Sequence, residues 1–255
     1  MINMFALEGE AVKISWNLFS WLSQRIGADE GARAMLFVAG VLLCIVVPYL
    51  LGSINPAILF SKIFYHEDIR SYGSGNAGST NVLRTYGKKM AILTFSCDLL
   101  KAAIAVVFGS LLLTNEIGGA IAGFFVIFGH SFPIFHKFKG GKGVACAAIV
   151  VLMMDWITFL ILLVVFVGVV LLSKMVSLGS VCGMGLYPIV LTAFTGVNGG
   201  AKPLFAVLTA VLVIFMHRKN LKRIYNGEES KISLKRTEKH KDGESAEEEK
   251  DKDDE

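Results

Sequence analysis

The chain has 255 residues, of which 54% are hydrophobic and 18% charged, and this hydrophobic share is above that of ordinary soluble domains. The net charge of +4 is unevenly divided: the last 28 residues carry 12 acidic and 7 basic side chains, which leaves 9 acidic and 18 basic ones in residues 1–227. A basic and strongly apolar body of this kind indicates an integral membrane protein and excludes an ordinary soluble domain.

Two polar segments flank the apolar body. Residues 1–33 mix large apolar residues with scattered charges, which favours an amphipathic helix on the membrane surface. The first long apolar run begins only near Ala34, so it is interpreted as a retained span and not as a cleaved signal sequence. Residues 228–255 contain almost no apolar residues and are expected to form a disordered, charged tail. The membrane domain is therefore predicted at 34–227.

Seven apolar runs make up this domain. A helical span needs roughly 17–25 mostly apolar residues, so five runs are long enough and two are short. The run at 144–154 is separated from its successor only by Asp155, so these two runs could also form one long helix. The runs are 35–60, 90–113, 117–135, 144–154, 156–172, 178–194 and 203–216.

Basic residues decide between these two alternatives. They cluster after the first, third and seventh runs, Lys174 alone follows the fifth, and they are almost absent from the other connections. A turn at Met154-Asp155-Trp156 puts every basic loop on one side, which the positive-inside rule assigns to the cytoplasm. A fused helix would put the basic cluster at 217–223 outside. We therefore predict an all-α integral membrane protein with seven transmembrane helices, its N-terminus outside and its C-terminus cytoplasmic.

The most informative polar motif is S-G-N-A-G-S-T-N-V-L-R at 74–84, set between apolar spans. Glycines free the backbone to turn N–H groups toward an anion, and short Ser, Thr and Asn side chains add hydrogen bonds. Arg84 offers a planar fork suited to phosphate. The motif is interpreted as half of a phosphate-handling site at the membrane surface. Its candidate residues are Ser74, Gly75, Asn76, Gly78, Thr80, Asn81 and Arg84.

Three further polar elements fall on the same predicted face. They are G-H-S-F-P-I-F and F-K-G-G-K-G-V-A within 129–145, S-L-G-S at 177–180 and H-R-K-N at 217–220. Each alone is also typical of a basic cytoplasmic loop or an interfacial cap, and their convergence is what favours an anion site. Gly143 follows Lys142, so the second element is not a P-loop, which needs Ser or Thr there. The candidate residues are Lys139, Gly140, Gly141, Lys142, Ser177, Ser180, His217 and Asn220.

Few other groups in the membrane domain can carry chemistry. Asp98 and Lys101 lie three positions apart inside the second run, where ionisable groups are costly, and form either a structural ion pair or part of a functional site. The four cysteines stand singly in apolar runs without a C-x-x-C pair, so no metal site is expected.

Together these motifs resemble the PlsY family, the integral-membrane glycerol-3-phosphate acyltransferases that use acyl phosphate as donor. The matching patterns are S-G-N-x-G-x-T-N-x-x-R, G-K-K, D-x-x-K, G-H-x-F-P-x-F-x-x-F-K-G-G-K-G-V-A, V-S-L-x-S and H-R-x-N-x-x-R, in the family's order. Ser79, Cys146 and Lys219 depart from the family's usual Ala, Thr and Glu, and none of these changes removes a group expected to do chemistry. The resemblance implies a seven-span protein of the bacterial cell membrane whose active site faces the cytoplasm.

The resemblance also implies a reaction. The sn-1 hydroxyl of glycerol 3-phosphate attacks the carbonyl of acyl phosphate, releasing phosphate and forming lysophosphatidic acid, the first acylation of phospholipid biosynthesis. Motif matching places Ser74, Thr80, Arg84 and Lys142 at the donor phosphate, Ser180, His217 and Asn220 at glycerol 3-phosphate, and Lys139 at either. Ser74, Arg84, Lys142 and His217 are the catalytic candidates. His217 is the candidate base, and the donor's own phosphate oxygens are the alternative. The implied enzyme is a monomer that works among membrane lipids without cofactor or nucleic acid, supplied by a soluble enzyme that makes acyl phosphate.

Other functions fit the residues less well. No histidine is followed five positions later by Asp, which excludes the His/Asp acyltransferase mechanism. A transporter of an anionic solute would suit the glycine-interrupted spans, but the chain halves show no internal repeat and the polar clusters gather at one face. A metal-dependent phosphotransferase would need more inward carboxylates than Glu67, Asp68 and Asp98.

Overall fold

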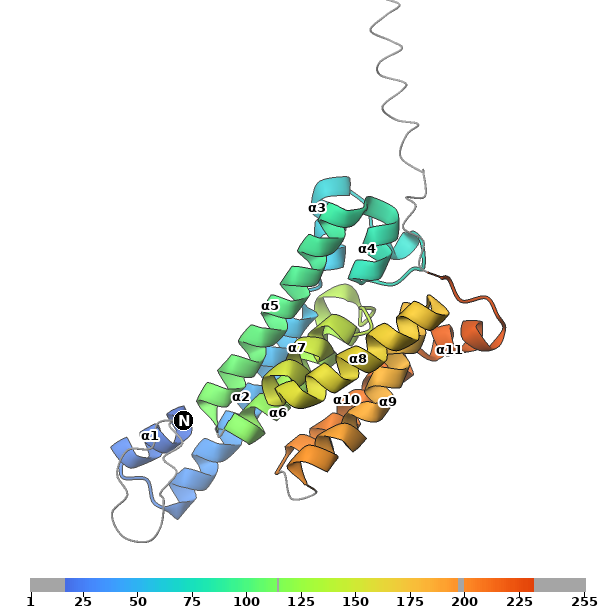
Figure 1. Ribbon diagram of the computed structural model, residues 1–255. Helices are drawn as coiled ribbons and strands as arrows, with labels where there is room; N and C mark the ends of the chain where they lie inside the picture. Colours follow the sequence, from blue (N-terminus) through green and yellow to red (C-terminus); the bar gives the residue numbers. More distant parts are fainter. Residues whose placement is uncertain (1–16, 114, 197–199, 232–255) are drawn as a thin grey trace, which may run out of the picture.

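The computed structural model describes residues 17–113, 115–196 and 200–231, and these ranges contain helices and loops without any strand. The predicted all-α class is thereby confirmed (Figure 1). The α-helices are α1 (Leu18–Arg25), α2 (Glu30–Ser53), α3 (Pro56–Tyr65), α4 (Ser79–Tyr86), α5 (Lys88–Leu112), α6 (Asn115–Ser131), α7 (Val144–Met154), α8 (Trp156–Ser173), α9 (Val176–Thr195), α10 (Lys202–Met216) and α11 (Arg218–Tyr225). Two short 3₁₀ helices, η1 (Ile69–Ser71) and η2 (Ile134–His136), lie in the loops.

Helix length supports five or six membrane spans in the described residues. The five segments that are long and apolar enough are Glu30–Tyr65, Lys88–Leu112, Glu116–His136, Trp156–Ser173 and Val176–Thr195. A sixth arises if α10 and α11, which are bent by 56° relative to each other, count as one span. The 11 residues of α7 extend about 16 Å, roughly half of a hydrocarbon core of about 30 Å. Length alone therefore does not make α7 the additional span that the seven-helix prediction requires.

The predicted break at Asp155 is confirmed. Helix α7 ends at Met154 and α8 begins at Trp156, with an extended backbone at Asp155 (φ −159°, ψ 106°). Asp155 Oδ1 accepts a hydrogen bond from the backbone N–H of Thr158 at 2.6 Å. An N-cap of this kind stabilises a helix start by about 1 kcal/mol. Asp155 thus ends α7 through its extended backbone and starts α8 through its carboxylate, and a fused helix over 144–172 is excluded.

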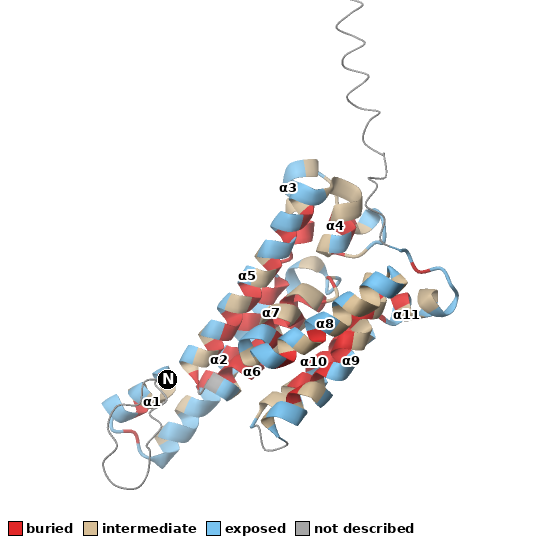
Figure 2. Cartoon of the chain, viewed as in Figure 1, coloured by how far each residue is buried: buried red, intermediate tan, exposed pale blue. Residues whose placement is uncertain are grey.

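Close backbone contacts hold α2 and α5 against α6. A Cβ added at Gly52 would overlap the carbonyl oxygen of Val126, and one added at Gly118 would overlap that of Gly109. Small residues at such crossings let two helix backbones approach closely, and the resulting van der Waals contacts stabilise helix association in a membrane. The buried core continues between α5, α6, α7, α9 and α10 through Val106, Ile127, Val150, Leu191 and Val213. Figure 2 shows buried residues along the inner faces of the helices.

Helix α8 contrasts with this core. Only Thr158 and Leu162 are buried on it, although all its residues from Trp156 to Ser173 form one strongly apolar segment. Large side chains such as Val164 and Leu172 are exposed at 73% and 90%. An exposed apolar surface on a helix long enough to cross a bilayer is typical of a segment that faces lipid. Figure 2 shows exposed residues along α8.

The flanking segments lie at opposite ends of the bundle. Helix α1, capped by Asn17 and packed through Phe19 on Phe37 of α2 (5.9 Å between ring centroids), lies far from α4 and α11 (Figure 1). Residues 1–16 and 232–255, with most of the predicted surface helix and tail, lie outside the described residues. The start of the tail departs from the prediction. Glu229 is not a solvated tail residue, because it is only 9% exposed and packs against α9 and α11 through hydrogen bonds.

Candidate active site

A cavity of about 610 Å³ lies among α4, α5, α7, α8, α9 and α11. Its polar end brings together most of the residues predicted from the motifs, although they come from four separate segments. The predicted site residues that line it are Ser74, Asn76, Gly78, Thr80, Asn81, Arg84, Lys142, Ser177, Ser180, His217 and Asn220. The structure thus assembles the four motifs around one space.

The rest of the same cavity is apolar. Most of its large lining side chains come from α5, α7 and α8, among them Phe95, Leu99, Ile149, Leu152, Phe159, Leu163 and Phe166. A polar end suits anionic groups, whereas an apolar slot of aliphatic and aromatic side chains suits a hydrocarbon chain. The cavity is therefore shaped for an amphiphile with a charged head. Nothing in the residue spacing indicated this slot, because its walls belong to three helices.

Asn81 folds the 72–81 loop. Its Oδ1 accepts a hydrogen bond from the backbone N–H of Ser74 at 2.8 Å, and its Nδ2 donates to the carbonyls of Ile69 (3.2 Å) and Tyr72 (3.0 Å). Gly73 has φ +57°, and a Cβ there would overlap Asn81 Oδ1. Both ends of the Asn81 amide are thus engaged by the loop backbone. This side chain therefore positions the backbone of Ser74, which lines the same cavity.

Helix α4 begins at the cavity. Gly78 precedes its first residue and supplies no side-chain cap, and Gly78, Ser79 and Thr80 all line the cavity. A helix N-terminus carries partial positive charge and attracts anions. Arg84 on the same helix lines the cavity too. The motif at 74–84 therefore combines backbone and side-chain groups suited to an anion.

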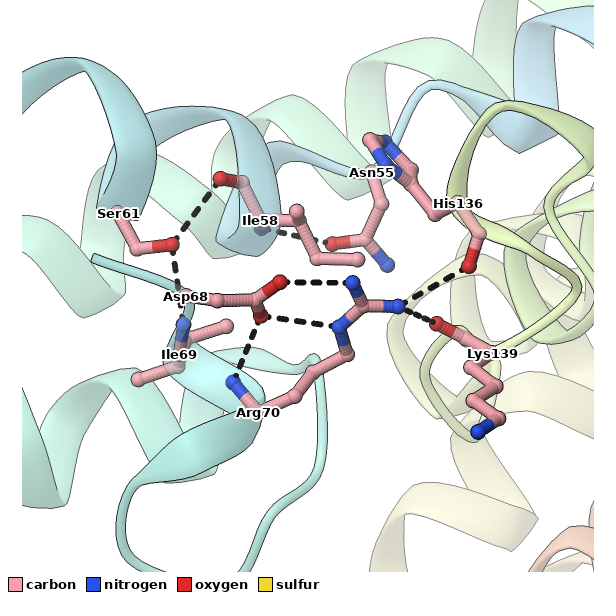
Figure 3. A network of polar contacts seen from close by, with 8 residues as sticks. All are labelled: Asn55, Ile58, Ser61, Asp68, Ile69, Arg70, His136 and Lys139. Atoms are coloured by element: carbon pink, nitrogen blue, oxygen red, sulfur yellow. Dashed lines mark hydrogen bonds and ion pairs between the residues drawn. The ribbon is translucent and has the colours of Figure 1, made fainter. Parts of the chain in front are cut away.

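Arg70 ties this loop to the loop that carries Lys142. Its Nε and Nη2 donate to the two carboxylate oxygens of Asp68 at 2.9 and 2.7 Å, which orients the guanidinium. Its Nη1 donates to the carbonyl oxygens of His136 at 3.0 Å and Lys139 at 2.9 Å, as Figure 3 shows. The Asp68 partner holds the pKa of Arg70 above its ordinary value, so the link stays charged. Arg70 thus fixes the two loops relative to each other.

Four predicted substrate-binding residues do not line the cavity. Lys139 is exposed and contributes its carbonyl to Arg70, whereas Gly140 and Gly141 donate backbone hydrogen bonds to the carbonyls of Ser131 (3.2 Å) and His130 (3.1 Å). A Cβ at Gly140 or Gly141 would overlap atoms of His130. These glycines let the loop lie directly on the end of α6. They hold the loop that carries Lys142, and they lie outside the lining of the cavity, as does Gly75.

Asp98 and Lys101 form the predicted intrahelical pair, and a third group joins them. Lys101 Nζ lies 2.8 Å from Asp98 Oδ1, and His130 Nδ1 lies 3.1 Å from the same oxygen. Lys101 also donates to the carbonyls of Gly52 (3.1 Å) and Ile54 (2.8 Å) at the end of α2. This buried network joins α2, α5 and α6 directly beneath the glycines that hold the Lys142 loop. The sequence signal for His130 was its place in the long glycine-lysine motif.

Lys142 is the cation that burial perturbs most at the polar end. Burial lowers its pKa to about 8, the negative charge of Glu229 opposes this shift, and the positive charges of Arg223 and Arg84 add to it. Burial disfavours the charged form of this ammonium, and a phosphate bound beside it would stabilise the charged form. The neighbouring positive charges therefore make this end of the cavity receptive to an anion.

His217 and Asn220 line the cavity from the bend between α10 and α11 and the first turn of α11. His217 is 2% exposed, and its Nδ1 lies 2.7 Å from the carbonyl oxygen of Val213, so this nitrogen carries the hydrogen. Nε2 is consequently the nitrogen available as a proton acceptor. Ser180 donates its hydroxyl hydrogen to Val176 O at 2.9 Å.

The residue that sequence reasoning missed is Glu229. Its carboxylate accepts hydrogen bonds from Ser177 Oγ (2.7 Å), Asn220 Nδ2 (2.6 Å) and Arg223 Nε (2.8 Å). Burial opposes its ionisation, but these three donors outweigh that effect and hold its pKa below the ordinary value. The residues that follow it in the sequence are almost all polar, so the sequence gave no signal that Glu229 would be buried.

Comparison with known proteins identifies the family to which the chain is similar. Residues 42–227 match the family model described as glycerol-3-phosphate acyltransferase. The curated glycerol-3-phosphate acyltransferase of Thermoanaerobacter sp. (strain X514) is 44% identical over 190 residues, covering 74% of this chain and 94% of the relative. That of Clostridioides difficile (strain 630) is 41% identical over 196 residues, covering 75% and 95%.

Solved structures agree with these relatives. The crystal structure of PlsY (YgiH), an integral membrane glycerol 3-phosphate acyltransferase, in its glycerol 3-phosphate form matches with a TM-score of 0.66 and 33% identity, over 76% of this chain and 96% of that one. Its lysophosphatidic acid form matches with a TM-score of 0.65 and 30% identity, over the same shares. The family model covers well over half of the chain, and the motifs that carry the family likeness surround one cavity. The chain belongs to the PlsY family of integral-membrane glycerol-3-phosphate acyltransferases.

Proposed function

We propose that this protein transfers an acyl group from acyl phosphate to the sn-1 hydroxyl of glycerol 3-phosphate, giving lysophosphatidic acid and inorganic phosphate. The observation that carries the proposal is the single cavity whose polar end holds Arg84, Lys142, His217 and Asn220 and whose remainder is an apolar slot. One substrate is a small phosphate ester, and the other joins a phosphate to a hydrocarbon chain. A space with both characters accommodates the two reactants side by side.

The donor half is assigned to α4 and the Lys142 loop. The acyl chain lies in the apolar slot, and the donor phosphate lies between the start of α4, Ser74, Thr80 and the cations Arg84 and Lys142. Attack on the carbonyl carbon places negative charge on its oxygen, and expulsion of phosphate places charge on the leaving group. Fixed positive groups stabilise both, and such electrostatic stabilisation is usually the largest catalytic contribution.

The acceptor half is assigned to α9 and the α10–α11 bend. Ser180, His217 and Asn220 line that wall, where they orient glycerol 3-phosphate. The sn-1 oxygen forms the new ester bond to the acyl carbon, the carbon–oxygen bond to phosphate breaks, and its electron pair leaves with phosphate. The hydroxyl proton goes to His217 Nε2, the nitrogen that the Val213 hydrogen bond leaves unprotonated, or to an oxygen of the departing phosphate.

The membrane arrangement follows from the same assignment. We infer seven spans with the N-terminus outside and the cavity's polar end toward the cytoplasm of a bacterial cell, where water-soluble glycerol 3-phosphate is available. The basic loops and the polar end share one side of the bundle, in agreement with the positive-inside rule. The short α7 is compatible with a span because the Lys142 loop folds back onto Ser131 and His130, so that α7 starts below the end of α6. The enzyme is proposed to act as a monomer, supplied by a soluble enzyme that makes acyl phosphate.

A direct assay tests the proposal. Purified protein is incubated with labelled glycerol 3-phosphate and either acyl phosphate, acyl-CoA or acyl-carrier protein, and lysophosphatidic acid is measured. We expect product only with acyl phosphate, because the described residues provide compact phosphate-binding loops without a nucleotide-binding domain. Comparable rates with acyl-CoA would refute the donor assignment, and uptake of glycerol 3-phosphate into vesicles without any product would support a transporter instead.

A further inference from the structure

A second cavity, of about 400 Å³, lies at the end of α7 that is farther from Lys142. Helix α7 begins two residues after Lys142, and its last two residues, Met153 and Met154, line this second cavity, which we call the distal pocket. Leu152, one position earlier, lines the larger cavity. The two cavities share no lining residue among the described residues, so the distal pocket is separate from the candidate active site.

Apolar side chains form most of the distal pocket. Val106, Val107 and Leu111 of α5 line it together with the two methionines at the end of α7. Val107 and Leu111 are four positions apart on one face of α5, and both are exposed. Helix α5 is long and apolar enough to cross a membrane, and exposed apolar side chains on such a helix are typical of a face toward lipid. The pocket is therefore a groove that a hydrocarbon chain can enter from the bilayer.

An ion pair forms the polar part of the same pocket. Glu116, in the first turn of α6, and Lys202, the first residue of α10, both line it. Lys202 Nζ lies 3.7 Å from Glu116 Oε1, and the two side chains are 20% and 59% exposed. This separation is longer than a hydrogen bond, and an exposed pair contributes little to stability. A ligand can therefore bind each of the two charges without displacing a strong internal contact.

The charges and the groove match the two parts of a phospholipid. Glu116 and Lys202 lie at the starts of two helices, and Leu111 and Met154 lie at the ends of two others, which is where a bundle meets the polar headgroup region. An ammonium group binds a phosphate, and a carboxylate accepts hydrogen bonds from a primary ammonium. A headgroup with one phosphate and one primary ammonium satisfies both side chains. A headgroup with a phosphate alone would place its negative charge beside Glu116.

We propose that the distal pocket binds a zwitterionic phospholipid, with its phosphate at Lys202, its primary ammonium at Glu116 and one hydrocarbon chain in the groove along α5 and α7. The occupant is a lipid and not a soluble zwitterion, because a headgroup without chains would leave the apolar lining uncovered. The bound lipid fills the space at the end of the short helix α7. The inference does not rest on the proposed reaction, since the pocket shares no lining residue with the larger cavity.

Lipid binding tests the proposal directly. Purified full-length protein in detergent is titrated with phosphatidylethanolamine or phosphatidylglycerol that carry identical acyl chains, and native mass spectrometry gives the dissociation constant of each bound lipid. We expect phosphatidylethanolamine to bind about fivefold more tightly, because its headgroup offers an ammonium to Glu116 whereas the other headgroup is anionic. Equal binding of the two lipids, or tighter binding of phosphatidylglycerol, would overturn the inference.

Charge variants assign this preference to the pocket. Glu116→Gln removes the carboxylate, and we expect the two lipids then to bind about equally. Lys202→Gln removes the partner of the phosphate, and we expect both lipids to bind about fivefold more weakly. Lys174→Gln is the matched control, because Lys174 is an exposed lysine after α8 that does not line the pocket, and it should match the unaltered protein. If Glu116→Gln and Lys202→Gln also match this control, the lipid binds elsewhere and the assignment fails.

Phosphoethanolamine, which has the same two charges without acyl chains, tests the role of the groove. We expect it not to displace bound phosphatidylethanolamine when the two are present at equal concentration, because the chain contacts favour the lipid. Displacement under these conditions would overturn the lipid assignment in favour of a soluble zwitterion. These measurements require no acyl transfer, so the lipid site and the proposed reaction can each fail without the other.

Discussion

Lys142 offers a test of the proposed donor site because its charge depends on pH within an accessible range. Burial lowers its pKa to about 8, so the ammonium predominates below that pH and is lost above it. At one pH unit above the pKa, roughly a tenth of the side chains remain charged. If the ammonium binds the donor phosphate, kcat/KM for acyl phosphate should be level at pH 6.5–7.5 and fall about tenfold near pH 9, because kcat/KM reports the free enzyme.

Two substitutions at Lys142 distinguish loss of its charge from other causes of a rate that falls with rising pH. Lys142→Ala removes the charge at every pH, and we expect kcat to fall by about 10²-fold or more, as for loss of a group that stabilises the transition state. Lys142→Arg keeps a cation whose pKa is above about 12, so its rate should show no decline near pH 8 even if the rate itself is lower. Initial rates of lysophosphatidic acid formation across pH measure both effects.

The refuting result is specific. A decline near pH 8 that persists unchanged in Lys142→Arg would assign the titration to another group or to the substrates. Hydrolysis of acyl phosphate is measured in parallel without enzyme, since loss of donor at high pH would imitate the decline. A Lys142→Ala enzyme with nearly normal kcat would exclude Lys142 from the donor site.

Three further predictions follow from the same geometry. Arg84→Ala should lower kcat steeply, by about 10²-fold, whereas Asn220→Ala should chiefly raise the KM for glycerol 3-phosphate; the reverse pattern in steady-state kinetics would mean that the two halves are interchanged. Arg70 lines no part of the cavity, yet Arg70→Lys should lower kcat by about tenfold or more, because an ammonium cannot bind two loop carbonyls and the Asp68 carboxylate at once as the guanidinium does. An undiminished kcat would show that this link between the two loops is dispensable. Single cysteines in a background without the native ones test topology: Trp156→Cys should react with an impermeant reagent from outside the cell and Lys174→Cys should not, and the opposite labelling would invert the proposed arrangement of α8.

Local chemistry was predictable from the sequence. The pairing of Asp98 with Lys101 follows from a spacing of three residues on one helix face, and the structure places their charged atoms 2.8 Å apart. The break at Asp155 follows from a carboxylate between two apolar runs, and that carboxylate caps α8. Helix spacing and capping involve neighbours in the chain, so residue types and their separation are enough to determine them.

The roles of individual polar groups depended on contacts between distant segments. Asn81 was predicted to bind substrate, and in the structure both ends of its amide form hydrogen bonds with the loop backbone. Lys139 was predicted in the site, and its side chain is exposed while its carbonyl accepts a hydrogen bond from Arg70. Glu229 was assigned to a solvated tail but is buried against Ser177, 52 residues away in the chain. Residue type and spacing could predict that these groups are polar and lie near one face. Which donor meets which acceptor is decided by the packing of α4, α9 and α11 around one cavity, since a hydrogen bond forms only where the folded backbone brings two groups within about 3 Å.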